Sequence, residues 1–333
     1  MMRRALHAAA ALAALSLAMP ASAEWKPTKP ITIIVPWAAG GSTDQVTRVT
    51  AGELEKALGG NVVVVNQPGA SGSIGTKAAL DAQKDGYTWT AGAAKDLGTY
   101  IVSGTLDTKI QDWHLYLNVA NVEIFSVNPS SPLKDMGEFV KMMKEKGDSL
   151  SVSTGGVNSS SFAAMEALKG AAGGTYKNVT YDGGNPAVIA AVSGEVMATS
   201  QLGAEQAEMI RAKKLRPLAV ASDKPLVIEG YGEIPPITNW VKNYPVTANY
   251  FGIWAPKGIP AEVVQAMDKA WADHMSKSEA LRKYAESKGA AVGAYYGEEA
   301  QKRVMPAVQV NAWQMFEGGK AKVKPDTVGI PKP

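Results

Sequence analysis

One stretch near the start of the chain has the pattern of a buried β-strand, a glycine turn and a helix start. Residues 31–35 are almost all β-branched and apolar, as in a strand covered on both faces. Pro36 cannot donate a ladder hydrogen bond, so we expect the strand to end there. The glycine pair 40–41 allows a tight turn, and residues 42–44 suit the first turn of a helix running to about residue 58. The pattern predicts one βα unit of an α/β fold.

The turn at 36–44 is a candidate site for an anion. Unpaired main-chain N–H groups at a helix start, together with the positive end of the helix dipole, attract negative charge. We therefore predict that this turn binds a carboxylate, chiefly through main-chain N–H groups. Asp44 is expected to be structural and to pair with Arg48, one helical turn further on. The candidate residues of this turn are Trp37, Ala38, Ala39, Gly40, Gly41 and Ser42.

The same strand–turn–helix pattern recurs, most clearly where a strand at 149–153 leads into 154–161. Further loops at 68–73, 92–96 and 182–186 are expected to follow strands, the first of them a buried strand at 61–66. Ligands of open α/β sheets gather outside the carboxyl ends of strands. Lys95 could neutralise a second carboxylate, although most lysines lie on the surface. The candidates from these loops are Ser71, Lys95, Thr154, Gly155, Gly156, Val157, Asn158, Ser159, Tyr181, Asp182 and Asn185.

The sequence lacks the parts of the main alternative sites. Residues 69–75 have the spacing G-x-x-G-x-x-G, which is not the dinucleotide fingerprint. There is no Cys, and only His114 and His274 lie beyond residue 23. Together with the absence of a G-x-S-x-G motif, this argues against an enzyme and predicts neither a cofactor nor a metal centre, although a site made only of carboxylates stays open.

The first residues have the pattern of a secretory signal peptide. A basic start (residues 1–4) precedes an apolar run (8–19) and the cleavage motif Ala21-Ser22-Ala23. We expect cleavage after Ala23 and a periplasmic product. The formal charge of +3 then falls to about +1 through loss of Arg3 and Arg4, which does not suggest a nucleic-acid partner. We expect a monomer.

Several motifs in a fixed order resemble one family. They are KPITIIVP (29–36), AGGSTD (39–44), VVVVNQPGASGSIG (62–75), DGYT (85–88), KLRPLAV (214–220) and APKGIP (255–260). On these motifs the chain resembles the Bug receptors, the periplasmic solute-binding proteins of tripartite tricarboxylate transporters. The resemblance implies an α/β fold of two lobes, the type II periplasmic binding protein clamshell, with the ligand cleft between the lobes. We expect lobe 1 to comprise 24–124 plus 250–333, and lobe 2 to comprise 125–249.

The resemblance also implies a small organic carboxylate as ligand, for which we expect a C4-type dicarboxylate, and delivery to the membrane subunits of the transporter. The alternatives are an aromatic or amino-acid carboxylate, a tricarboxylate, or a role as ligand sensor for a signalling partner.

The chain departs from the family pattern in the second lobe. Family members often have His where this chain has Phe162 and Gly where it has Asn158. We expect Phe162 to pack inward and Asn158 to influence which acid is accepted.

Overall fold

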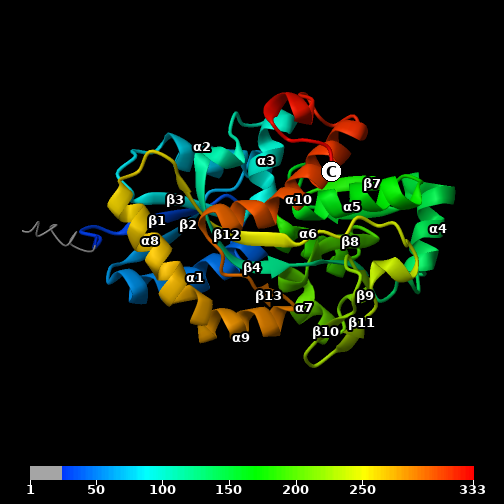
Figure 1. Ribbon diagram of the computed structural model, residues 1–333. Coiled ribbons are helices and arrows are strands. Elements are labelled where there is room, and N and C mark those ends of the chain that lie inside the picture. Colours follow the sequence, from blue (N-terminus) through cyan, green and yellow to red (C-terminus); the bar gives the residue numbers. More distant parts are fainter. Residues whose placement is uncertain (1–24) are drawn as a thin grey trace, which may run out of the picture.

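The computed structural model describes residues 25–333, so the predicted signal peptide and its cleavage site lie outside the described residues (Figure 1). Its strands form two large sheets side by side along the molecule, with helices packed around each (Figure 1). None of the helices described in 25–333 combines the length and the apolar character needed to cross a membrane.

The first sheet has the strand order β13-β4-β12-β3-β1-β2. β1 pairs in parallel with β2 and β3, whereas β12 is antiparallel to β3 and β4. The predicted strand at 31–35 is confirmed as β1, an inner strand. The strands are β1 (Ile31–Val35), β2 (Val62–Asn66), β3 (Thr88–Ala93), β4 (Trp113–Asn121), β12 (Asn249–Pro256) and β13 (Ala291–Val292).

The second sheet has the order β7-β6-β8-β5-β9, and a separate hairpin of β10 and β11 lies beside it. β6 pairs in parallel with β7 and β8, and β5 is antiparallel to β8 and β9. The strands are β5 (Glu123–Val127), β6 (Ser151–Thr154), β7 (Lys177–Thr180), β8 (Ala198–Leu202), β9 (Arg216–Val220), β10 (Leu226–Ile228) and β11 (Gly232–Ile234).

Helices cover both sheets, and apolar cores lie beneath them. α10 contacts both α3 and α5, so it joins the two parts of the fold. Beside the first sheet lie α1 (Ser42–Leu58), α2 (Ser73–Asp81), α3 (Ala94–Ser103), α8 (Ala261–Asp273), α9 (Glu279–Lys288) and α10 (Gly297–Glu317). Beside the second lie α4 (Met136–Lys146), α5 (Ser160–Ala172), α6 (Gly184–Ser193) and α7 (Gly203–Arg211).

The chain passes between the sheets twice. Val122 alone separates β4 from β5, and the chain returns to the first sheet at Asn249, the start of β12. These two points suggest the lobe limits, which we propose at Val122 and just before β12, close to the limits expected from the sequence.

Two local expectations are wrong. β2 is an edge strand, and alternate valines on it, Val63 and Val65, are exposed; a run of valines does not distinguish an edge strand from a central one. Residues 92–96 are not a loop, because β3 runs to Ala93 and α3 begins at the next residue. Small residues here belong to a tightly packed strand, in which Gly92 pairs with Gly252 of β12.

Candidate functional site

A cavity lies where loops and helix starts of the two sheets meet. Its walls come from both sheets and combine hydroxyl, amide and carboxyl groups with the aromatic rings of Trp37 and Phe251. Its free volume is small, about 40 Å³. The lining residues are Trp37, Gly41, Ser42, Thr43, Ala93, Asp96, Gly155, Ser159, Ser160, Ser161, Gly183, Gly184, Gln201, Leu202, Glu205 and Phe251.

Five helices point their N-termini at this cavity. α1, α3, α5, α6 and α7 each contribute an N-cap or first-turn residue to its walls. Each helix start carries a partial positive charge from the aligned peptide dipoles. Two of these helices belong to the first sheet and three to the second, so the positive ends converge from both sides. This convergence makes the cavity electrostatically suited to an anion.

The predicted turn at 36–44 is held in shape by Asp44. One oxygen of its buried carboxylate accepts the Gly40 N–H at 2.9 Å, and the other pairs with Arg48 at 2.9 Å and accepts a hydrogen bond from Asn66. The predicted Asp44–Arg48 pair is therefore confirmed. Burial alone would raise the pKa of Asp44, but the hydrogen bonds from Arg48, Gly40 and Asn66 outweigh it, so the pKa is lowered. Asp44 stays ionised and fixes the glycine turn.

Most of the expected main-chain donors of this turn already have partners. The Gly40 N–H donates to Asp44, and the Gly41 N–H donates to the Ala38 carbonyl at 3.4 Å. The Ser42 N–H, at the first position of α1, donates to Glu205 Oε1 at 3.0 Å. Glu205 belongs to α7 beside the second sheet, so this bond joins the two parts of the fold. The helix start predicted to bind a carboxylate thus binds one, supplied by the protein itself.

The predicted site residues fall into four groups. Trp37, Gly41, Ser42, Gly155 and Ser159 line the cavity.

The second group lies where loops of the two sheets touch. A Cβ atom placed on Gly156 would lie 2.2 Å from Ser71 Oγ, and one on Gly40 would lie 3.2 Å from Asn185 Nδ2. A Cβ atom placed on Gly183 would likewise lie 3.3 Å from the Ala38 nitrogen, while Ala39 is exposed. These residues set how closely the two sheets approach each other.

The third group does not reach the cavity. Thr154 is buried and its hydroxyl donates to Asn178 at 2.7 Å, as an ordinary structural hydrogen bond. The Tyr181 hydroxyl donates to Glu195 at 2.7 Å, and Asp182 is exposed.

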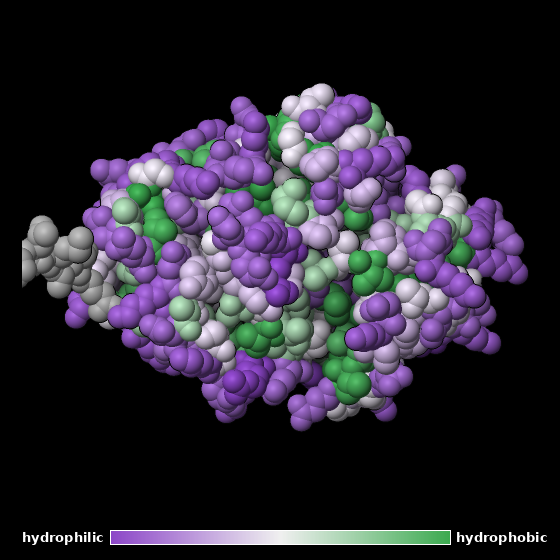
Figure 2. Space-filling view, viewed as in Figure 1, coloured by the Kyte–Doolittle hydropathy of each residue, from purple (hydrophilic) through white to green (hydrophobic). Residues whose placement is uncertain are grey.

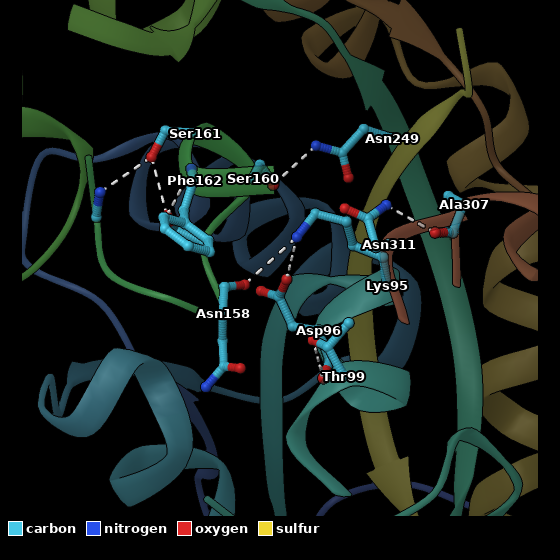
Figure 3. Close-up of polar contacts among 12 residues, drawn as sticks. Lys95, Asp96, Thr99, Asn158, Ser160, Ser161, Phe162, Asn249, Ala307 and Asn311 are labelled. Atoms are coloured by element: carbon cyan, nitrogen blue, oxygen red, sulfur yellow. Dashed lines mark hydrogen bonds and ion pairs between the residues drawn. The ribbon is translucent and has the colours of Figure 1, made fainter. Parts of the chain in front are cut away.

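Lys95, Val157 and Asn158 line a second, smaller cavity beside the first, together with Phe162. Lys95 is a buried lysine rather than a surface one. Its ammonium group pairs with Asp96 at 2.7 Å and donates to the Asn158 carbonyl at 3.3 Å, as Figure 3 shows. The Asn158 side chain donates to Thr105 at 3.1 Å, across the junction of the two sheets. As expected, Phe162 packs inward, with 5% of its surface exposed.

The sequence analysis missed several lining residues, of which Glu205 is the most consequential. It lies three residues after Leu202, the last residue of β8 and the N-cap of α7. The rule used for the other loops, that ligands gather at the carboxyl ends of strands, applies equally to the carboxyl end of β8. The rule therefore points to the start of α7, the helix that carries Glu205. Asp96, which lines the cavity, lies next to the candidate Lys95 but was not itself a candidate.

Comparison with known proteins identifies the family and the relatives of this chain. The model of the tripartite tricarboxylate transporter family receptor matches residues 46–316. Protein BugT of Bordetella pertussis is 28% identical over 265 residues, which cover 78% of this chain and 80% of that protein.

Solved structures extend the comparison to the fold. The periplasmic binding protein BugD matches with a TM-score of 0.80 and 26% identity, over 89% of this chain and 99% of that one. MatC from Rhodopseudomonas palustris with bound malate matches with a TM-score of 0.73 over 87% and 98%. At 22% identity, the likeness to MatC shows a shared fold.

Proposed function

Because the chain belongs to the tripartite tricarboxylate transporter receptor family, we propose that it captures a C4-type dicarboxylate in the cavity between its two sheets and delivers it to the membrane subunits of such a transporter. The family and the α/β periplasmic binding protein fold predicted from the sequence are confirmed. Members of this family are solute-binding proteins and not enzymes. Cleavage after Ala23 stays a prediction.

The observation that carries the proposal is the convergence of five helix N-termini on one cavity. A dicarboxylate has two anionic ends, and such helix starts face the cavity from both sheets. The Ser42 N–H already donates to a carboxylate oxygen, that of Glu205, at 3.0 Å, which supports the same position for one end of the ligand. The hydroxyl groups and N-terminus at Ser160 and Ser161 of α5 suit the other end.

Binding and closure are coupled in this account. The contacts that join the two parts of the fold include Ser42 with Glu205, Lys95 with Asn158, and Gln45 Nε2 with the Ala204 carbonyl at 3.4 Å. A ligand that bridges both sets of helix starts adds contacts that exist only when they face each other. Differential contacts of this kind are what shift a two-state equilibrium toward the closed form.

A thermal-unfolding scan of the purified protein with a panel of acids tests the proposal. We expect succinate, malate or fumarate to raise the melting temperature, because a ligand that binds only the folded state stabilises it by about 2.7 kcal/mol at 100 times its Kd. Monocarboxylates, tricarboxylates, aromatic acids and amino acids complete the panel. A panel in which no C4 dicarboxylate raises the melting temperature, while another class does, would contradict the assigned ligand; no shift with any acid would contradict carboxylate binding itself.

A further inference from the structure

Glu205 is placed where the ligand is proposed to bind. Its carboxyl group lies in the cavity wall, and each oxygen accepts one main-chain N–H. Oε2 accepts from the Leu202 N–H at 3.1 Å, so the Glu205 side chain binds the main-chain donor of the N-cap residue of α7. Oε1 accepts from Ser42 at the start of α1, at 3.0 Å. The Glu205 side chain therefore connects the N-termini of two helices from opposite sides of the cavity.

The cavity walls contain two carboxyl groups and, among the described residues, no Lys, Arg or His. The first, Asp96, is paired with Lys95, which lies just behind the wall. Only main-chain N–H groups bind the second, Glu205, in the described structure. A Cβ atom added to Gly184 would lie 2.2 Å from both of its oxygens, so the carboxyl group is also closely surrounded. Glu205 has little room to turn away from an incoming ligand.

A ligand carboxylate bound here would be repelled by the ionised carboxylate of Glu205. The Ser42 N–H can point at one acceptor, so a ligand carboxylate that takes it leaves Glu205 Oε1 without a donor and beside a ligand oxygen. Two ionised carboxylates at contact distance in a water-poor site repel strongly, which is why such pairs hold one proton between them. A single proton converts the repulsion into a short, charge-assisted O–H···O hydrogen bond.

We propose that the Glu205 carboxyl group takes up one proton from solvent when a dicarboxylate binds, and donates it as a hydrogen bond to the ligand, so that Glu205 selects for the charge of the ligand and makes its affinity depend on pH. This inference rests on the proposed function. The proton adds to Glu205 Oε1, the ligand stays fully ionised, and no other bond changes.

The surroundings of Glu205 agree with this assignment. Burial raises the pKa of Glu205 to about 7, and the hydrogen bonds from Ser42 and Leu202 only partly counteract it. The neighbouring titratable groups are Glu123 on β5, itself buried, and Tyr284 on α9, whose hydroxyl donates to the Ser42 carbonyl. The other charges near the cavity occur as pairs, Asp96 with Lys95 on α3 and Asp44 with Arg48 on α1. An added carboxylate can only raise the pKa of Glu205 further.

Calorimetric titration with succinate tests the proposal on three proteins: wild type, Glu205→Gln and Glu208→Gln. Titrations in two buffers with different ionisation enthalpies give the number of protons taken up per ligand. The amide oxygen of Gln can still accept the Leu202 N–H, and its NH2 group can donate to the ligand without uptake of a proton. Glu208 lies one turn further along α7 with its side chain 63% exposed, so it is a matched control for the loss of one charge.

For the wild type we expect uptake of between about 0.5 and 1 proton per succinate at about pH 7.5, and an affinity that falls by up to about tenfold per pH unit between about pH 7 and 9. Protonated Glu205 is the binding form, so affinity is lost as pH rises through its pKa in the ligand-free protein. Glu205→Gln should take up no proton and show a flat pH profile over this range, whereas Glu208→Gln should behave like the wild type.

Three outcomes would overturn the proposal. Succinate binding to the wild type without proton uptake would leave the proposed function intact and remove the role of Glu205. Proton uptake that persists in Glu205→Gln would assign it to another group, such as Glu123. Tighter binding of aspartate than succinate, lost in Glu205→Gln, would mean that Glu205 binds an ammonium group. If the wild type bound no acid at all, the proposed function would fail, and this inference with it.

Discussion

At the scale of single residues, Asp44 determines the shape of the turn that faces the cavity. Its buried carboxylate holds the Gly40 N–H, the Asn66 amide and the Arg48 guanidinium group at once. Gly40 has a φ of +78°, a left-handed conformation that residues with side chains rarely adopt. The carboxylate thus stabilises a backbone conformation from which Gly41 and Ser42 project into the cavity.

Asp44→Asn should lower the free energy of unfolding by about 1–3 kcal/mol, because one oxygen is replaced by an amide that opposes a donor. The pKa of Asp44 is lowered in the folded protein, so its contribution is present above the unfolded value of about 3.9 and is lost as pH falls through the folded value. The difference between variant and wild type should therefore shrink below about pH 4. Urea unfolding measures both effects.

Asp81→Asn is the control for this variant, because the Asp81–Lys77 pair on α2 is exposed on both sides and should contribute less than about 1 kcal/mol. Equal stability of the Asp44 and Asp81 variants would contradict the structural role of Asp44.

Gly41 offers a direct test of ligand contact in the same turn. Its φ of −71° suits any residue, and an added Cβ would lie 3.3 Å from the Ala38 carbonyl oxygen and 3.5 Å from Glu205 Oε1 in the cavity wall. Gly41→Ala should fold and bind succinate at least about tenfold more weakly, a loss of about 1.4 kcal/mol. Gly52→Ala on α1, where a Cβ meets nothing within 4 Å, is the matched control. Equal succinate affinity of the two variants, measured by calorimetry, would remove Gly41 from the site.

At this scale the sequence predicted features within one segment better than contacts between segments far apart in the chain. The turn and the Asp44–Arg48 pair follow from spacing alone, because both lie within one strand–helix unit. The bond from Ser42 to Glu205 joins residues 163 positions apart, and nothing in either segment specifies that they meet. The same limit applies to Lys95, whose buried position depends on Asn158 from the other part of the fold.

At the scale of elements, α3 is the helix that the sequence analysis missed, and it links the cavity to the outer layer of the molecule. Its first turn carries Lys95 and Asp96, and its middle packs against α10. The contact is close at Gly98, where an added Cβ would lie 2.3 Å from Val308 Cγ1. The sequence concealed the start of this helix because β3 ends at Ala93 and α3 begins at the next residue, with no turn between them.

Gly98→Ala should destabilise the protein by about 1–3 kcal/mol, because the branched Val308 side chain cannot give way easily. Displacement of α3 should also weaken succinate binding through Asp96 in the cavity wall. Gly170→Ala in α5 has no atom within 4 Å of the new Cβ and should stabilise by about 0.5–1 kcal/mol. Chemical unfolding of both variants measures the contrast. A stabilising effect of Gly98→Ala would contradict the close packing of α3 on α10.

At the scale of the whole molecule, the two sheets and the order of their elements could largely be anticipated. The resemblance supplied the two-lobed plan, and strand–turn–helix repeats supplied most of the elements. What could not be anticipated is how the helix starts combine, because five separate N-termini meet only after both sheets have formed.

The face in Figure 2 is largely hydrophilic, and hydrophobic side chains gather there near the β10–β11 hairpin, where Val227 is exposed.

A crystal structure of the protein with bound succinate tests the central claim most directly. We predict that one succinate carboxylate lies within hydrogen-bond distance of the Ser42 N–H at the start of α1, and that the other meets the start of α5 at Ser160 and Ser161. Glu205 should lie beside the first carboxylate. Succinate held by residues of only one sheet, or bound outside the cavity where the five helix starts meet, would contradict the account.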